Sequence, residues 1–114
     1  IFVDFHAEMS SEKVALGRYL DGKVSAVVGT HTHVPTADQR VLKGGTAVIS
    51  DVGFTGPMES ILGVREDIIF NTFITSMPQK FELADGPIQL NAVVIDLGYD
   101  GKAKSIERVD RVIN

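Results

Sequence analysis

The stretch IFVDFHAEMSSEKVALGRYLDGKVSAVVG, residues 1–29, decides the fold because it contains two apolar runs separated by one amphipathic segment. Residues 1–5 and 24–28 are short and rich in β-branched and aromatic side chains, a composition typical of buried strands. Residues 12–20 between them have helical periodicity. Strand, helix and strand within this length predict a βαβ unit, in which the two strands run parallel with a right-handed crossover.

The connecting helix has recognisable ends. Ser10 or Ser11 is expected to cap its N-terminus, and Asp21-Gly22 is expected to end it. Apolar side chains four positions apart should form the face that the helix buries, namely Ala15 with Tyr19 and Leu16 with Leu20.

The rest of the chain predicts further strands and one more helix, so the fold class is α/β with a mixed sheet. A hairpin is expected around Asp100-Gly101. A helix is expected over residues 66–75, with Ile69 and Phe73 on one face. The remaining strands are expected at residues 40–42, 46–49, 80–83, 88–97 and 103–112.

The composition excludes several function classes. With 11 basic and 15 acidic side chains the net charge is -4, which does not favour binding to nucleic acid or to an anionic membrane. The chain has no cysteine, so disulfides, thiolate metal sites and cysteine nucleophiles are ruled out. Any metal ion must be held by imidazole and oxygen ligands. Without a spanning apolar run or a signal-peptide pattern, we expect a cytoplasmic protein with no membrane partner.

The chain opens inside an apolar strand, with no initiating methionine and no preceding turn. Natural domains seldom begin in this way, so we expect residues 1–114 to be a piece of a longer protein. Loss of the neighbouring strands would leave an apolar strand edge or sheet face exposed. The missing part of the protein, or a second copy of the chain, would then cover that surface.

All three histidines of the chain follow the two strands of the βαβ unit. His6 comes directly after residues 1–5, and His31 and His33 come shortly after residues 24–28. Because parallel strands end at the same edge of a sheet, the three imidazoles should converge there. Residues two apart in an extended segment point to the same side, so His31 and His33 could serve one ion or two neighbouring ions. This placement favours a metal site.

Four carboxylates are candidates for supporting roles. Asp4 and Glu8 lie two residues from His6 and could orient its ring as hydrogen-bond acceptors. Asp51 follows a strand and precedes a glycine-rich loop, a position that suits a residue facing substrate and suits a plain turn almost as well. Asp38 is the fourth candidate.

Four segments together resemble the YmdB-like branch of the calcineurin-like metallophosphoesterases. They occur in the family's order and spacing along essentially the whole chain. Gly-x-His-x-His alone is moderately specific, whereas the ordered blocks are strongly so. The segments are DFHAE at residues 4–8, GTHTHVPTAD at 29–38, SDVGFTGP at 50–57 and GPIQLN at 86–91.

The resemblance implies that residues 1–114 are the C-terminal half of a single metallophosphoesterase domain, a calcineurin-like sandwich of mixed β-sheets flanked by helices. It implies two divalent metal ions, iron or manganese, with zinc or magnesium as alternatives. His6 and His31 would bind one ion and His33 the other. The implied reaction is hydrolysis of phosphodiesters such as 2′,3′-cyclic nucleotides by a metal-bound hydroxide.

The resemblance also implies that the ligand set is incomplete. The family's N-terminal half carries an aspartate ligand, a bridging carboxylate, an asparagine ligand and a histidine near the leaving group, and none of these motifs occurs here. Two-metal hydrolysis needs ions about 3.5–4 Å apart, and three histidines cannot hold both. We therefore expect the parent protein to be the enzyme and this chain to be inactive alone. The expected partners are the phosphodiester or cyclic-nucleotide substrate, the missing N-terminal half and a second copy of the chain.

Two other hypotheses remain open. In one, the chain is a metal-binding or oligomerisation module without catalysis. In the other, it is a single-metal hydrolase in which His6, His31 and His33 hold zinc and Glu8 or Asp38 acts as the base.

Overall fold

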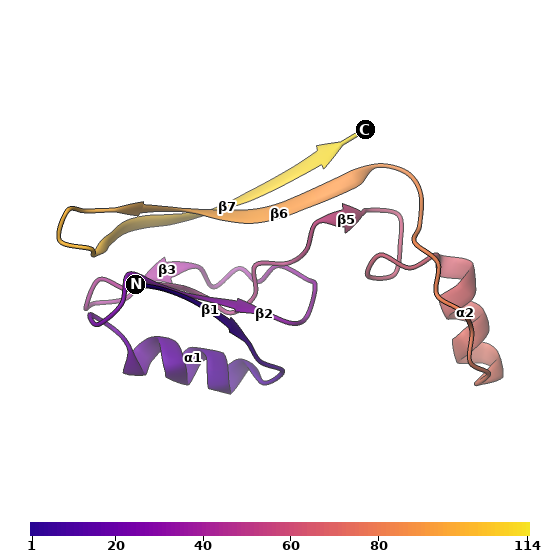
Figure 1. The fold of residues 1–114 in the computed structure, drawn as a ribbon, viewed down its shortest axis with the longest axis horizontal. Helices are drawn as coiled ribbons and strands as arrows, with labels where there is room; N and C mark the ends of the chain where they lie inside the picture. The colour runs from indigo at the N-terminus through magenta and orange to yellow at the C-terminus, as the bar shows by residue number, and fades with distance from the viewer. The chain divides into compact units, whose positions relative to one another are not determined.

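The first thirty residues form the βαβ unit that the sequence predicts (Figure 1). A computed structural model describes all of residues 1–114. Strand β1 (Phe2–His6) is followed by helix α1 (Ser10–Tyr19) and strand β2 (Ala26–Thr30). The two strands are parallel, and their register places His6 opposite Thr30. They therefore end together, which confirms the predicted parallel pairing.

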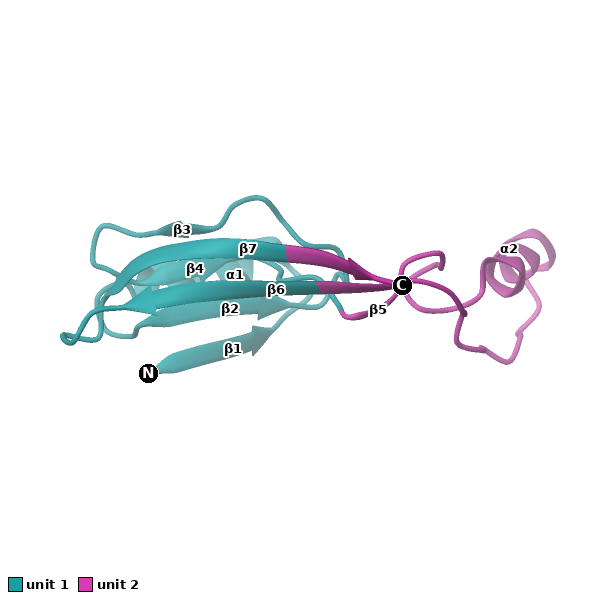
Figure 2. Ribbon diagram, turned by 90° about the horizontal axis from the view of Figure 1, so that it is seen from above, with its two compact units in different colours: residues 1–54, 91–109 teal, residues 55–90, 110–114 magenta.

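The chain folds as two units, shown in different colours in Figure 2. Unit 1 contains Ile1–Phe54 and Asn91–Val109, and unit 2 contains Thr55–Leu90 and Asp110–Asn114. No linker-like run of Pro, Gly or Ser marks this division in the sequence. Taken together, the chain has two sheets and two helices, which is the mixed α/β fold that the sequence predicts.

Unit 1 contains a four-stranded sheet with the order β1-β2-β4-β3. Strands β3 (Arg40–Val41) and β4 (Ala47–Ile49) lie within one residue of their predicted positions. β4 is parallel to β2, and β3 is antiparallel to β4. β2 is thus paired on both sides, whereas β1 pairs only with β2 and forms one edge of the sheet.

The hydrophobic core of unit 1 lies between this sheet and strands β6 (Ile88–Leu97) and β7 (Ala103–Ile113). Alternate residues of β2 and β4 face the core, while Val27 of β2 lines a pocket with residues of α1 on the opposite face. β2 is therefore buried on both faces, which explains its continuous apolar run. The buried core residues are Ala26, Val28, Ala47, Ile49, Ala103 and Ile106.

β6 and β7 are neighbours in the second sheet and are joined by the tight turn predicted around Asp100-Gly101. The Gly98 N–H donates to the Lys102 carbonyl at 2.8 Å, and the Gly101 N–H donates to the Gly98 carbonyl at 2.9 Å. Gly101 has a φ of 80°, a left-handed conformation that glycine adopts without steric cost. The predicted hairpin is confirmed.

The predicted cap of α1 is wrong. The N-cap position is Met9, which makes no side-chain capping bond, and Ser10 and Ser11 already lie inside the helix. Glu12 lies in the first turn, where a negative charge interacts favourably with the helix dipole.

The buried face of α1 also differs from the predicted one. Lys13 and Gly17 are its buried positions. Of the two predicted apolar pairs, Leu16 and Leu20 are half-buried, whereas Ala15 and Tyr19 are exposed. A Cβ atom at Gly17 would lie 3.0 Å from Cγ1 of Val48, so the glycine allows α1 to approach β4 closely. The helix is therefore placed by a close backbone approach and a buried lysine rather than by large apolar side chains.

Unit 2 contains β5 (Gly56–Pro57), which the sequence analysis does not predict, and α2 (Glu66–Thr75), which it does. β5 pairs with the first residues of β6. Of the two residues expected to share one face of α2, Ile69 is buried and Phe73 is 78% exposed. The strand expected at residues 80–83 is wrong, because only an isolated bridge from Leu83 to Val64 forms there.

Neither α1 nor α2 is long and apolar enough to cross a membrane.

The edge of the sheet at β1 is apolar and open. Phe2 is 60% exposed, and Ile1 is more exposed still. An apolar hollow beside the strand is lined by Phe5 together with Leu16 and Tyr19 of α1. The structure thus has the exposed apolar strand edge that the sequence analysis expects. Such an edge can pair with another chain.

We expect the 114-residue chain, expressed alone, to self-associate through this edge. Phe2→Lys should shift it toward monomer, because a charged side chain on an edge strand opposes pairing with another strand. Tyr99→Lys is the matched control, since Tyr99 is an exposed aromatic residue in the β6–β7 turn and not on the β1 edge. Sedimentation velocity measures the outcome. A wild-type chain that is monomeric at all concentrations would contradict the prediction.

Candidate metal centre

The parallel strands β1 and β2 bring two of the three histidines into contact. His6 is the last residue of β1, and His31 follows the last residue of β2. Nε2 of His6 and Nδ1 of His31 lie 3.3 Å apart. The two rings meet edge to face, with centroids 5.1 Å apart. Both side chains are exposed, so a ligand can reach the pair from solvent.

A neighbouring hydroxyl orients His6. Oγ1 of Thr30, the residue opposite His6 in the register, lies 3.2 Å from Nδ1 of the His6 ring. This contact leaves Nε2 directed toward His31. Histidines that bind metals usually hold the second ring nitrogen in such a hydrogen bond, which fixes the tautomer and the ring direction.

The spacing of the two nitrogens fits one shared metal ion. Imidazole nitrogens bind a divalent metal at about 2.0–2.1 Å, so two of them at right or tetrahedral angles lie about 2.8–3.4 Å apart. The observed 3.3 Å falls within this range. The donor set also suits divalent transition metals, for which imidazole is a common ligand.

His33 takes no part in this pair. Its ring stacks on Phe54, with centroids 5.9 Å apart and an angle of 26° between the ring planes. No group of three or more His, Asp or Glu side chains is arranged to hold a metal ion. The structure therefore confirms the convergence of His6 and His31 but does not assemble the three-histidine site that the single-zinc hypothesis needs.

The backbone of His33 is strained. Its φ of 62° lies in the left-handed region, where a residue with a Cβ atom is uncommon. Such conformations cost about 1–3 kcal/mol, persist only where the surrounding structure enforces them, and cluster at functional sites. His33 belongs to residues 29–36, which we call the histidine loop.

Asp51 supports the histidine loop from beneath. Its carboxylate is completely buried and accepts the Thr32 N–H at 2.7 Å and the Gly53 N–H at 2.9 Å. Burial raises the pKa of Asp51, but these hydrogen bonds and the charge of Lys13 outweigh that effect and hold the pKa below its ordinary value. The sequence suggests that Asp51 either faces substrate or belongs to a plain turn; in the structure its carboxylate is buried and bonds to the histidine loop.

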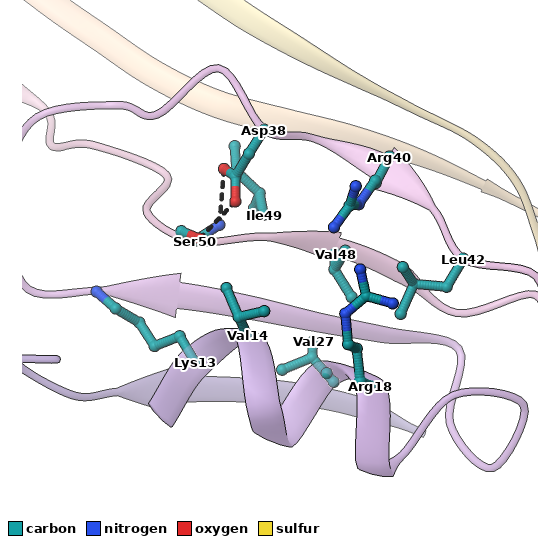
Figure 3. A pocket seen from close by; sticks show the side chains of 11 residues that line it. Lys13, Val14, Arg18, Val27, Asp38, Arg40, Leu42, Val48, Ile49 and Ser50 are labelled. Atoms are coloured by element: carbon teal, nitrogen blue, oxygen red, sulfur yellow. Dashed lines mark hydrogen bonds between the residues drawn. The ribbon is translucent and has the colours of Figure 1, made fainter. Parts of the chain in front are cut away.

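Asp38 closes the other end of the histidine loop. It accepts the Ser50 N–H at 3.1 Å, the Ser50 hydroxyl, and the Thr36 hydroxyl at 2.7 Å. Figure 3 shows the Asp38 carboxylate directly above Ser50. Burial raises the pKa of Asp38, but the hydrogen bonds from Ser50 and Thr36 lower it by more, so the net shift is downward. Asp38 thus links Thr36, the last residue of the histidine loop, to Ser50 and makes no hydrogen bond to a histidine.

Asp4 and Glu8 do not orient His6. Both are exposed, and the partner of the His6 ring is Thr30 instead. Sequence reasoning missed Thr30 because the contact depends on the register of two strands, not on spacing along the chain. It also missed Phe54, which lies far from His33 in sequence but stacks on its ring.

A family model described as YmdB-like protein matches residues 1–109. The chain belongs to the YmdB-like family. This confirms the resemblance carried by the four sequence segments.

Relatives of this YmdB-like chain are longer than it is. It is 52% identical to a 2′,3′-cyclic-nucleotide 2′-phosphodiesterase of Bacillus subtilis over 99% of its own length but only 42% of that protein's. A crystal structure of a hypothetical protein from Thermus thermophilus matches 97% of the chain and 44% of that protein, at 41% identity and a TM-score of 0.90. A crystal structure described as a novel phosphatase from Mycoplasma pneumoniae matches 96% of this chain, and the match covers 40% of that protein's chain. The identity is 38% and the TM-score is 0.90.

Gly29 begins the histidine loop of the YmdB-like chain at a point of close packing. A Cβ atom there would lie 1.9 Å from the Ser50 carbonyl oxygen and 2.7 Å from Cδ of Lys13. The oxygen belongs to the backbone and cannot move aside as a side chain could. Glycine at this position is therefore a packing requirement.

We expect Gly29→Ala to lower the free energy of unfolding by more than about 3 kcal/mol, the upper end of ordinary overpacking. Gly86→Ala is the control. It has no atom within 4 Å of the added Cβ but has a φ of 109°, so it tests loss of a glycine without a clash. Its cost should be about 1–2 kcal/mol, that of left-handed backbone alone. Urea unfolding measures both, and equal losses would contradict the packing argument.

The YmdB-like chain should also lose stability in acid. The pKa values of Asp38 and Asp51 are lower in the folded chain than in the unfolded chain, where Asp titrates near about 3.9. Their stabilisation is therefore present above about pH 4 and is lost as the pH falls through the folded-state values. The urea midpoint should fall steeply below about pH 4.

Asp38→Asn should lower the midpoint at neutral pH and weaken this acid dependence. Asp96→Asn is the matched control, because Asp96 is exposed on β6 and accepts no hydrogen bond from a side chain or loop. A midpoint that rises on acidification would show that the two carboxylates do not stabilise the fold in their charged form.

Proposed function

We propose that this chain supplies the histidine ligands of a two-metal centre in a phosphodiesterase that hydrolyses phosphodiesters such as 2′,3′-cyclic nucleotides. One observation carries the proposal: Nε2 of His6 and Nδ1 of His31 face each other at 3.3 Å where two parallel strands end. That is the edge at which open α/β folds bind ligands.

The relatives support the reaction class. The Bacillus subtilis relative is named as a 2′,3′-cyclic-nucleotide 2′-phosphodiesterase, and the Mycoplasma pneumoniae structure is described as a phosphatase. In unit 1, α1 packs on one face of a sheet whose other face packs on a second sheet. This layering is compatible with one part of a calcineurin-like β-sandwich.

We assign His6 and His31 to one ion and His33 to the other. His33 lies apart from the pair, with its ring stacked on Phe54, which is compatible with a ligand of a second metal ion. We propose iron or manganese as the ions, since imidazole suits iron and the carboxylate ligands expected from the N-terminal half of the parent protein suit manganese. The remaining ligands and the acid for the leaving group would come from the N-terminal half of the parent protein.

Two divalent ions, when bound, supply Lewis acidity toward the phosphoryl oxygens and lower the pKa of a water molecule. The residues of this chain would hold the ions and orient the ligands that bind them. Thr30 keeps Nε2 of His6 directed toward His31, and Asp51 holds the peptide between His31 and His33. These contacts fix the direction of the His6 ring and the position of the loop peptide, so they would reduce the rearrangement that metal binding requires.

We expect His6→Ala and His31→Ala, in the protein expressed from its complete gene, to abolish Mn²⁺ binding at one position. The rate of hydrolysis of 2′,3′-cyclic AMP and bis-p-nitrophenyl phosphate should then fall by more than about 100-fold. Loss of a residue that only orients a metal ligand costs about 10–100-fold. Steady-state kinetics and Mn²⁺ titration measure the two effects. Thr30→Val, which removes only the orienting hydroxyl, should cost about 10–100-fold.

The 114-residue chain alone should show negligible turnover of the same substrates with added Mn²⁺. Turnover at ordinary enzymatic rates that His31→Ala abolishes would show that no further half is needed. Unchanged kinetics in His6→Ala and His31→Ala would contradict the metal assignment itself.

A further inference from the structure

Lys13 of α1 and Asp51 form a buried ion pair beneath the histidine loop. Nζ of Lys13 lies 3.5 Å from Oδ2 of Asp51, and their side chains are 3% and 0% exposed. Burying two charges carries a desolvation penalty that their attraction often fails to recover, so such a pair is weak evidence for a stabilising role. Its presence here calls for another explanation.

The hydrogen bonds of Asp51 supply one. Oδ2 accepts the N–H of Thr32, the residue between His31 and His33. Oδ1 accepts the N–H of Gly53, beside the Phe54 that stacks on His33. One buried carboxylate therefore holds the peptide from which both loop histidines diverge, and also the segment that carries the stacking partner of one of them.

The backbone of Asp51 adds a second attachment. Its carbonyl accepts the Thr36 N–H at 3.0 Å, and its own N–H donates to the Thr36 hydroxyl at 2.9 Å. The histidine loop is thus fastened to Asp51 near its middle and at its end. The two attachments lie on either side of His33, whose φ of 62° is in the left-handed region that residues with a Cβ atom seldom occupy.

Lys13 reaches Asp51 by passing over Gly29, where a Cβ atom would lie 2.7 Å from the lysine Cδ. Figure 3 shows Lys13 extended from α1 toward the end of β2. The lysine is the positive charge that the buried carboxylate contacts. The glycine of the Gly-x-His-x-His motif and a lysine sixteen positions earlier are therefore parts of one arrangement.

We infer that Lys13 and Asp51 are positioning residues for the metal site: Lys13 holds the Asp51 carboxylate in place, and Asp51 holds Thr32 and so sets the directions of His31 and His33. The inference rests on the proposed function, since the directions of the histidines matter because they bind metal. Asp51 bonds to the loop peptides and not to a histidine, so it acts through the backbone.

Mn²⁺ titration, followed by the electron paramagnetic resonance of the free ion, tests the inference in the protein expressed from its complete gene. Asp51→Asn and Lys13→Met should each weaken Mn²⁺ binding about 10–100-fold, the range for loss of a residue that orients a ligand. In the metal-free protein the Thr32 amide should exchange with solvent faster in Asp51→Asn than in the wild type, which reports on the loop without any metal.

Thr46→Val is the matched control, because Thr46 is equally buried but precedes β4, whereas Asp51 follows it. Its hydroxyl donates to the Val24 carbonyl at 2.7 Å and accepts the Gly22 N–H at 2.9 Å. Thr46→Val should lower the melting temperature while leaving Mn²⁺ affinity and Thr32 exchange unchanged. An equal loss of affinity in Thr46→Val and Asp51→Asn would reduce the effect to general instability and overturn the inference.

The double variant Lys13→Met/Asp51→Asn separates the two roles further. Its melting temperature should recover toward the wild-type value, because no buried charge is left without a partner. Its Mn²⁺ affinity should stay low, because the carboxylate that held Thr32 is still absent. Affinity that recovers together with the melting temperature would mean that the pair serves stability alone.

His31→Ala in the same titration distinguishes failure of the inference from failure of the proposed function. If the wild type binds Mn²⁺ no better than His31→Ala, the proposed metal site fails and the inference fails with it. If His31→Ala abolishes binding but Asp51→Asn retains wild-type affinity, only the inference fails.

Discussion

The parallel pairing of β1 with β2 is the constraint on which the candidate site depends. The register that places His6 opposite Thr30 makes the two strands end at the same edge. His31, the next residue after Thr30, is thereby brought to 3.3 Å from His6. An antiparallel pairing would put the residues that follow the two strands at opposite edges of the sheet. The crossover through α1 makes the parallel arrangement possible, since a short turn could not.

The same packing that stabilises unit 1 shapes the histidine loop. β2 is buried on one face by the second sheet and on the other by α1, and Gly29 continues this close packing to the point where the loop begins. There the side chain of Lys13 crosses to Asp51. Stability and site geometry therefore share residues, so a change at Gly29 or Lys13 cannot affect one without risk to the other.

The helix α1 shows where periodicity misleads. Apolar spacing favours Ala15 and Tyr19 as its buried face, yet Lys13 and Gly17 are buried instead. Hydrophobicity ranks lysine among surface residues, because a buried ammonium is costly unless a charge meets it. That charge is Asp51, which follows β4 and becomes a neighbour of Lys13 only after folding. The strand predicted at residues 80–83 is wrong for a similar reason. Its composition is typical of a strand, but the segment pairs with the rest of the chain through one isolated bridge only.

The sequence by itself determined most of the elements and the order of the candidate site residues along the chain. Runs of β-branched residues, the Asp100-Gly101 turn and the placement of all three histidines after two strands are local features that need no partner to be recognised. Only the tertiary structure decided which histidines meet, that His33 stacks on Phe54, and that Asp51 lies buried against Lys13. These outcomes depend on strand register and on contacts between residues far apart in the chain, which no local pattern of side chains records.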